Sequence, residues 1–266
     1  MGRLAGLSAP PILVDRVVQT FVRLYAIDLD EAIVPEGGFR SFNEFFTRRL
    51  RSGARPLDPD PGALISPADG RLDDMGAVDA ASVLRIKGRD YRVQELLADP
   101  DLGQKYRGGW YFIVYLSPRD YHRVHAPVSG PVQSARYVPG TLYPVNAIGT
   151  EHVEGLFARN ERVVVTQQSE RFGVVSTVMV GAIGVGRIGL SFDDIETNVG
   201  LSGGLREYGE AAPRLERGDE LGVFNLGSTV IVFVEPGRLE PPRAERGEHV
   251  RMGSAIGIAS ATLGEA

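Results

Sequence analysis

Residues 226–234 read Leu-Gly-Ser-Thr-Val-Ile-Val-Phe-Val, a short polar turn that leads directly into five apolar residues. An apolar run of this length is typical of a buried strand. A serine that follows a glycine can attack the glycine's own carbonyl, because glycine has no side chain to block the approach. Gly227 and Ser228 are therefore a candidate reactive pair, although Gly-Ser-Thr before a strand is more often only a turn.

Two upstream segments carry side chains suited to activating that serine. Residues 121–125 read Tyr-His-Arg-Val-His and hold two of the four histidines, while residues 66–70 read Ser-Pro-Ala-Asp-Gly and present Asp69. A neutral imidazole is the usual acceptor of a hydroxyl proton near pH 7, and a carboxylate can hold that imidazole in the right tautomer. His122 and His125 thus supply a candidate base and a candidate second proton-transfer group. Taken singly, each segment reads as a turn or as structural histidines.

Composition excludes several other chemistries. The chain has 266 residues, of which 43% are apolar and 24% charged, as in a soluble globular protein. The absence of cysteine excludes thiol nucleophiles, disulfides and thiolate zinc sites. Two histidines three residues apart without a third ligand at a recognised spacing do not predict a metal site. The net charge of −5 argues against a nucleic-acid partner.

The first sixty residues differ in texture from the rest. Apolar residues at helical spacing predict a helix over residues 12–25, and Ser41-Phe-Asn-Glu44 is a capping box that opens a second helix through Leu50. Residues 57–61 read as a linker. No secretory signal is visible at the N-terminus, and no apolar run approaches the roughly 20 residues that span a bilayer.

A basic and aromatic cluster closes this N-terminal segment. It contains two phenylalanines that we expect to be exposed, followed by arginines: Phe45, Phe46, Arg48, Arg49, Arg51 and Arg55. Such a cluster is usually a solvated face. Together with the amphipathic helix before it, it could instead contact an anionic bilayer, where each basic residue contributes about 1 kcal/mol.

Beyond residue 60 the sequence predicts strands. Short apolar runs separated by Gly, Pro and Asp turn signals lie at residues 111–116, 162–167, 174–180, 185–190 and 230–234. One short helix is expected at residues 93–98. We therefore expect a mainly β (α+β) protein, with a helical segment over residues 1–60 and a β-rich catalytic domain over residues 61–266.

Taken jointly, these residues resemble the phosphatidylserine decarboxylase family, whose members are self-cleaving, pyruvoyl-dependent enzymes. The matching motifs keep the family's order from residue 42 to residue 229: Phe42-Asn-Glu-Phe-Phe46, Ser66-Pro-Ala-Asp-Gly70, Tyr121-His-Arg-Val-His-Ala-Pro127, Tyr137-Val-Pro-Gly140, Leu156-Phe-Ala-Arg-Asn-Glu-Arg162, Val180-Gly-Ala182, Gly218-Asp-Glu-Leu-Gly222 and Leu226-Gly-Ser-Thr229. One departure is Pro144, where many members have a serine. The resemblance also implies a β core like the sandwich-like fold of biotinyl and lipoyl carriers, with an N-terminal helical appendage.

The resemblance implies a first, self-processing stage. Asp69 orients His125, His125 takes the proton from Ser228, and the Ser228 oxygen attacks the Gly227 carbonyl to form an ester. Elimination and hydrolysis then leave a pyruvoyl group derived from Ser228. The expected products are a β chain, residues 1–227, and an α chain, residues 228–266, which stay together as partners.

The resemblance implies a second, catalytic stage that needs no metal. The pyruvoyl carbonyl forms a Schiff base with phosphatidylserine and acts as the electron sink for decarboxylation to phosphatidylethanolamine. His122 is the expected proton-transfer group in this stage. Such an enzyme would bind peripherally to the cytoplasmic side of the cell membrane, here with weak attachment, and a homo-oligomer is compatible with it.

Three alternatives remain open at this point. The first is a serine hydrolase that uses Asp69, His125 and Ser228 as a triad, although the Gly-x-Ser-x-Gly elbow is missing. The second is a pyruvoyl-dependent decarboxylase of a soluble amino acid. The third is a non-catalytic membrane-binding β domain. His152 and His249 carry no motif and are expected to be structural or exposed.

Overall fold

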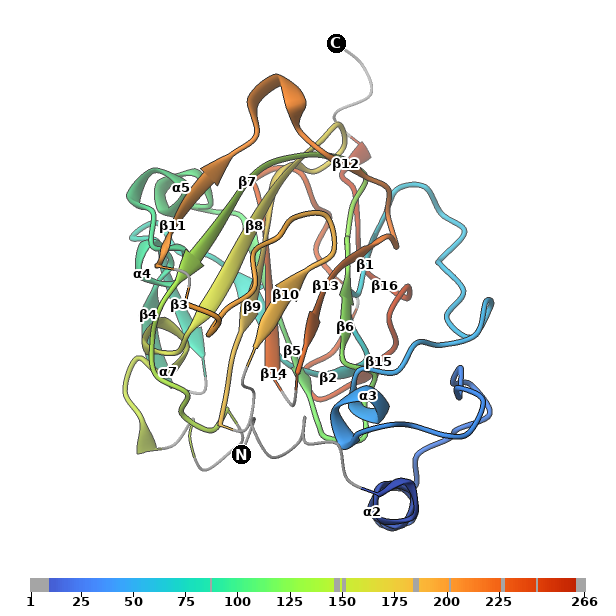
Figure 1. Ribbon diagram of the computed structural model, residues 1–266. Helices are drawn as coiled ribbons and strands as arrows, with labels where there is room; N and C mark the ends of the chain where they lie inside the picture. Colours follow the sequence, from blue (N-terminus) through green and yellow to red (C-terminus); the bar gives the residue numbers. More distant parts are fainter. Residues whose placement is uncertain are drawn as a thin grey trace.

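A computed structural model of the chain describes residues 10–86, 88–145, 149, 152–183, 187–200, 202–225, 228–242 and 244–261. Its centre is a large antiparallel sheet with the strand order β11-β7-β8-β9-β14-β5-β2-β15, to which β12 adds by pairing with β7. A three-stranded sheet, β10-β13-β6, lies in front of it (Figure 1). Two small pairs, β1-β16 and β3-β4, complete the strands of the described residues.

The strands of the large sheet are β2 (Gly70–Ala77), β5 (Trp110–Leu116), β7 (Gly130–Val138), β8 (Arg162–Ser169), β9 (Gly173–Val180), β11 (Gly204–Glu207), β12 (Arg214–Leu215), β14 (Ser228–Val234) and β15 (His249–Val250). The smaller sheets contain β1 (Ala63–Ile65), β3 (Val83–Ile86), β4 (Arg89–Arg92), β6 (Arg123–His125), β10 (Ile188–Leu190), β13 (Glu220–Phe224) and β16 (Ala255–Ile258). The helices are α2 (Pro11–Tyr25), α3 (Phe42–Phe46), α4 (Val93–Leu97), α5 (Pro100–Lys105), α7 (Leu156–Arg159) and the 3₁₀ turn η1 (Gly209–Ala211).

The apolar run over residues 230–234 lies in β14, at the centre of the large sheet. All seven residues of β14 are buried, between β9 on one side and β5 on the other. A strand covered on both faces has no solvent side, which explains why its apolar run shows no alternation. Met179 of β9 lies against Gly222 of β13, so the three-stranded sheet covers one face. Tyr106 packs against Phe233 on the other face, at a ring-centroid distance of 5.5 Å. The expected sandwich-like β core is confirmed.

Most of the expected elements are present, with shifts at their ends. The helix over residues 12–25 is α2, the helix over 93–98 is α4, and four of the five predicted strands are β5, β8, β9 and β14. Of the fifth, predicted over residues 185–190, β10 covers residues 188–190, and residues 185 and 186 lie outside the described part of the chain. The second helix is shorter than expected, because α3 ends at Phe46 rather than at Leu50. Its capping box is confirmed on one side, since the Ser41 hydroxyl accepts from the Glu44 amide at 3.1 Å.

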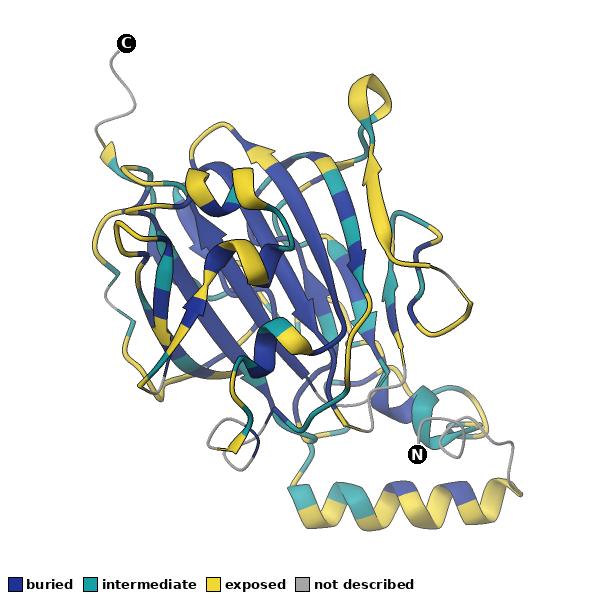
Figure 2. Cartoon of the chain, turned by 90° about the vertical axis from the view of Figure 1, so that its left-hand side faces the viewer, coloured by how far each residue is buried: buried dark blue, intermediate teal, exposed yellow. Residues whose placement is uncertain are grey.

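The N-terminal helices lie at one end of the molecule, with α2 set apart from the sheets (Figure 1). One face of α2 packs on α3 in a small apolar cluster of its own, built on Val14, Val18 and Phe45. The opposite face is solvent-exposed (Figure 2). No described helix is both long and apolar enough to span a bilayer.

Candidate active site

Ser228 lies at the first position of β14, next to the last residue of β5. It pairs in register with Leu116, so its side chain shares a face with Leu116 and Val230. The three-stranded sheet covers that face. Its strand β6 carries His125. The Ser228 hydroxyl is fully buried and has no hydrogen-bond partner in the described part of the chain. A buried hydroxyl without a partner costs free energy, and such groups are frequent at reactive sites. Gly227 lies outside the described residues.

His125 is held in one tautomer by the turn that follows β12. Its Nδ1–H donates to the Gly218 carbonyl at 2.7 Å, which leaves Nε2 as the basic nitrogen. Gly218 has a φ of +92°, a conformation that L side chains rarely adopt, and this aims its carbonyl at the ring. Burial lowers the pKa of His125, so the ring is neutral at physiological pH. A neutral imidazole with an unprotonated ring nitrogen is what a general base requires.

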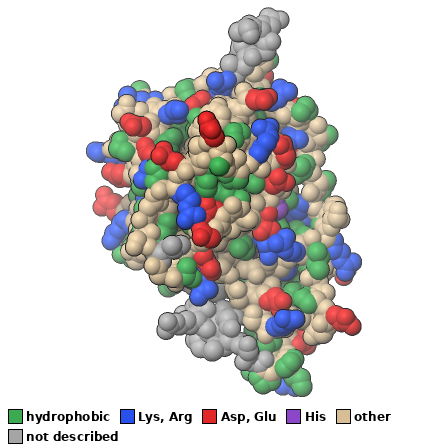
Figure 3. Space-filling model, turned by 45° about the horizontal axis from the view of Figure 1, so that its top comes forward, with side chains coloured by type: hydrophobic (Ala, Val, Ile, Leu, Met, Phe, Trp, Pro, Cys, Tyr) green, Lys and Arg blue, Asp and Glu red, His purple; other side chains and the backbone are tan. Residues whose placement is uncertain are grey.

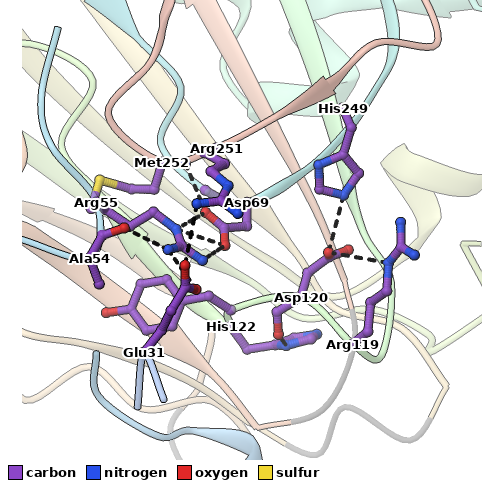
Figure 4. A network of polar contacts seen from close by, with 12 residues as sticks. Glu31, Ala54, Arg55, Asp69, Arg119, Asp120, His122, His249, Arg251 and Met252 are labelled. Carbon is purple, nitrogen blue, oxygen red and sulfur yellow. Dashed lines mark hydrogen bonds and ion pairs between the residues drawn. The ribbon is translucent and has the colours of Figure 1, made fainter. Parts of the chain in front are cut away.

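The expected hydrogen bond between Asp69 and His125 is not among those of the described residues. The Asp69 carboxylate is held instead by Arg55, in a two-pronged pair with distances of 2.6 and 2.9 Å, and by the Met252 amide at 2.8 Å. Figure 4 shows this network, in which Glu31 also reaches Arg55. Asp69 remains close enough to His125 for its charge to raise the pKa of the imidazole against the effect of burial. Its influence on His125 here is electrostatic rather than a direct orienting contact.

Tyr121 also contacts His125, a role that its sequence motif did not predict. Its hydroxyl donates to His125 Nε2 at 3.2 Å, so it occupies the position expected for Ser228. Burial raises the pKa of Tyr121 to about 12, which keeps the phenol protonated and able to donate. The only sequence signal for it was its place in the 121–125 motif.

Gly70 of the upstream motif must be a glycine for a structural reason. A Cβ at this position would lie 2.4 Å from the Tyr115 carbonyl oxygen.

His122 is fully buried between the 117–121 turn and α3. Its Nδ1–H donates to the Asp120 carbonyl at 2.7 Å, and its Nε2 has no partner among the described residues. The ring lies 3.9 Å from that of Phe46, centroid to centroid. Burial lowers the pKa of His122 to about 3, so Nε2 is a neutral acceptor over the physiological range. His122 can take up a proton, and it can deliver one only after it has received it.

The expectation that Phe45 and Phe46 are exposed is wrong. Both are buried, at 0% and 2% exposure, because α3 packs between α2 and the 119–123 segment. Arg48 is buried as well, and it lies over the Phe45 ring at 5.2 Å. Arg49 is exposed and pairs with Glu220 at 3.2 Å, while Arg51 donates to the Ala32 carbonyl. The cluster is therefore not a single surface, and Arg55 belongs to the Asp69 network.

The α3 helix forms part of the site rather than a separate appendage. Asn43 donates from its amide to the Asn225 side chain at 2.9 Å, just before the undescribed residues 226 and 227. The Thr47 carbonyl accepts from Arg123 at 3.0 Å.

Among the remaining histidines, His249 is partly exposed and contacts Asp120 at 3.3 Å. No cluster of three or more His, Cys, Asp or Glu residues suited to a metal ion occurs in the described ranges.

The fold and the site together define a β-rich protein in which a buried serine begins a central strand and two buried, neutral histidines lie in and just before strand β6 of the sheet that covers it. The family model for phosphatidylserine decarboxylase matches residues 42–258. Similar curated proteins, each called phosphatidylserine decarboxylase proenzyme, come from Pseudomonas fluorescens (43% identity, covering 90% of this chain and 84% of that protein), Brevibacillus brevis (40%, covering 90% and 86%) and Bordetella petrii (40%, covering 98% and 93%). The chain belongs to the phosphatidylserine decarboxylase family.

Proposed function

We propose that this chain is the proenzyme of a phosphatidylserine decarboxylase that cleaves itself at Gly227-Ser228. The observation that carries the proposal is Ser228 itself, at the start of a central strand, whose buried hydroxyl has no partner among the described residues, in a chain whose relatives are called proenzymes. The position suits cleavage, because Ser228 is the first residue of β14. After cleavage the pyruvoyl group would be the first residue of the α chain, and the strand itself would stay intact. A pyruvoyl group there would supply a carbonyl that condenses with the substrate amine and withdraws electrons as carbon dioxide leaves.

The residues present support a division of labour in self-cleavage. His125 offers Nε2 as the base, with Nδ1–H fixed on the Gly218 carbonyl. In this proposal Ser228 replaces the Tyr121 hydroxyl at Nε2 when its proton is removed. The negative charge of Asp69 stabilises the resulting imidazolium, as it already opposes the lowering of the His125 pKa by burial. The Asp69 charge is itself held in place by Arg55.

His122 is proposed to act in decarboxylation. An ammonium group must lose a proton before it can attack a carbonyl, and Nε2 of His122 accepts that proton in this proposal, with the negative charge of the bound substrate raising the pKa of this histidine above its value in the free enzyme. The same nitrogen can then return the proton to the carbon that has lost carbon dioxide. The Phe46 ring excludes water from this histidine, which keeps the proton within the site.

Purified protein analysed by intact mass spectrometry tests the proposal directly. The expected result is two chains that correspond to residues 1–227 and 228–266, the second beginning with a pyruvoyl group, together with release of phosphatidylethanolamine from phosphatidylserine. A single full-length chain with hydrolase activity would favour the serine hydrolase instead. Turnover of a free amino acid at the expense of the lipid would favour the soluble-substrate alternative.

We further propose that the exposed face of α2 attaches the protein peripherally to a membrane, on the cytoplasmic side. Leu13, Val17 and Leu24 share this face at helical spacing and are 53%, 46% and 74% exposed. Arg16 and Arg23 flank them on the same helix. An exposed apolar stripe with flanking arginines is typical of a helix that lies in the lipid interface. The end of the molecule away from α2, by contrast, carries interspersed charges of both signs (Figure 3).

The α2 face is tested with vesicles of phosphatidylcholine that contain phosphatidylglycerol, an anionic lipid that is not the substrate. A triple variant, Leu13→Ser, Val17→Ser and Leu24→Ser, should sediment less with vesicles. We expect its vesicle–water partition coefficient to be about 10- to 100-fold lower than that of the wild type. Wild-type binding should weaken as salt is raised. Leu205→Ser, which changes an exposed leucine of the edge strand β11, is the matched control and should bind as wild type. Equal sedimentation of both variants would exclude α2 as the docking face.

A further inference from the structure

We infer that Arg48 binds the phosphodiester of the substrate headgroup and thereby selects phospholipid-type amines at residue 228. The inference rests on the proposed function, since it concerns the substrate of that site. It goes beyond it by naming the residue and the chemical group through which a lipid headgroup is distinguished from a free amino acid.

Arg48 is a buried cation whose guanidinium is only partly hydrogen-bonded within the described part of the chain. Only 6% of its surface is exposed, and neither Nε nor Nη1 has a hydrogen-bond partner in the part of the chain that the structure describes. Nη2 donates to the Arg119 carbonyl at 3.2 Å, and the guanidinium lies over the Phe45 ring. The side chain is therefore fixed in place by contacts that leave two donors of its planar fork unused.

No carboxylate of the described residues pairs directly with this cation. Burial lowers the pKa of Arg48, which reflects the unfavourable desolvation of its charge. The nearby Asp69 carboxylate is bound by Arg55 and the Met252 amide, and the Asp120 carboxylate by Ser117 and His249. A buried charge without a partner is strongly destabilising. The expected explanation is an anion that arrives from outside the chain.

Arg48 lies beside the reacting end of the sheet. It contacts Arg119, three residues beyond the Leu116 that pairs with Ser228, and its charge lowers the pKa of His122. His122 Nε2 and the Ser228 hydroxyl are also buried and have no hydrogen-bond partner among the described residues. Cation, base and reactive residue thus await partners within one region. A substrate that carries an amine and an anion would satisfy them together.

The chemistry of the reaction indicates which anion Arg48 binds. Phosphatidylserine carries a carboxylate, which loses its charge as carbon dioxide leaves, and a phosphodiester, which keeps its charge throughout. A cation bound to the departing carboxylate would stabilise the ground state more than the transition state and slow the reaction. A cation bound to the phosphodiester anchors the headgroup without that penalty, and arginine is well suited to phosphate oxygens.

The test uses the processed enzyme and two soluble amines that differ in the anion they carry. Glycerophosphoethanolamine has the phosphodiester but no carboxylate, and L-serine has the carboxylate but no phosphodiester. Each is trapped on the α chain with cyanoborohydride, and the concentration that gives half-maximal adduct is read by intact mass. Arg48→Gln should raise this concentration about 10- to 100-fold for glycerophosphoethanolamine and leave it unchanged for L-serine. Arg48→Lys should lie between wild type and Arg48→Gln, since it keeps the charge but loses the fork.

Arg85→Gln is the control, because Arg85 is an exposed arginine on the β3-β4 hairpin. It should leave both half-maximal concentrations as in wild type. A loss for L-serine alone would assign Arg48 to the carboxylate, and equal losses for both amines would assign it a structural role; either result overturns the inference. If wild-type enzyme traps neither amine, the pyruvoyl proposal fails instead, which keeps the two failures distinct.

Discussion

Ser228→Ala is expected to leave a single uncleaved chain of 266 residues with no decarboxylase activity. The hydroxyl is both the nucleophile that attacks the Gly227 carbonyl and the source of the reactive carbonyl, so its loss removes both stages at once. Because the wild-type hydroxyl is buried and makes no hydrogen bond to any described residue, alanine at this position should cost the fold little. Denaturing electrophoresis and intact mass measure cleavage, and carbon dioxide release measures activity. Cooperative melting of the inactive variant near the wild-type temperature would show that it is folded.

Thr229→Val provides the matched control for Ser228→Ala. Thr229 follows directly in β14, is equally buried and also has a hydroxyl without a partner among the described residues. Removing that hydroxyl while keeping the shape should leave cleavage and activity intact. Cleavage in Ser228→Ala at the wild-type rate would contradict the proposed chemistry, whatever the activity of the product.

The sequence specified the β core more completely than the N-terminal segment. The apolar run of β14 predicted a buried strand because a strand with both faces covered leaves a strong signal. Phe45 and Phe46 left no comparable signal. A five-residue helix packed on two sides looks, in sequence, like an exposed aromatic and basic cluster. Only the contacts of α3 with α2, Asn225 and His122 show that it is buried.

The site was predictable in its members but not in its connections. Asp69, His122, His125 and Ser228 all belong to motifs, yet no spacing reveals that Arg55 rather than His125 binds the Asp69 carboxylate. The same holds for Gly218, which lies 93 residues from His125 in the chain and reaches it only through the pairing of β13 with β6. Long-range hydrogen bonds follow from tertiary packing, which single motifs do not encode.

The two histidines are expected to fail at different stages. His122→Ala should still yield the two chains, because His125 is the base proposed for self-cleavage, while decarboxylation should fall by about 10²- to 10⁴-fold through loss of proton transfer. His125→Ala should slow self-cleavage by a similar factor, so that uncleaved chain accumulates. Time courses of chain appearance and of phosphatidylethanolamine release, each per mole of processed α chain, separate the two effects.

The pH dependence of decarboxylation adds a readout that a merely structural histidine would not give. With its pKa lowered to about 3 by burial, His122 is neutral in the free enzyme at every pH from 5 to 8. Protonation of His122 would be favoured only as the pH falls toward 3, so kcat/KM should show no step near 6.5 that depends on this residue. His122→Gln, which keeps a polar group but cannot relay the proton, should lower the plateau across the whole range without moving its edges. A step near pH 6.5 that disappears in His122→Gln would mean that the free enzyme holds this histidine in contact with water. Blocked cleavage in His122→Ala, together with normal cleavage in His125→Ala, would reverse the two assignments.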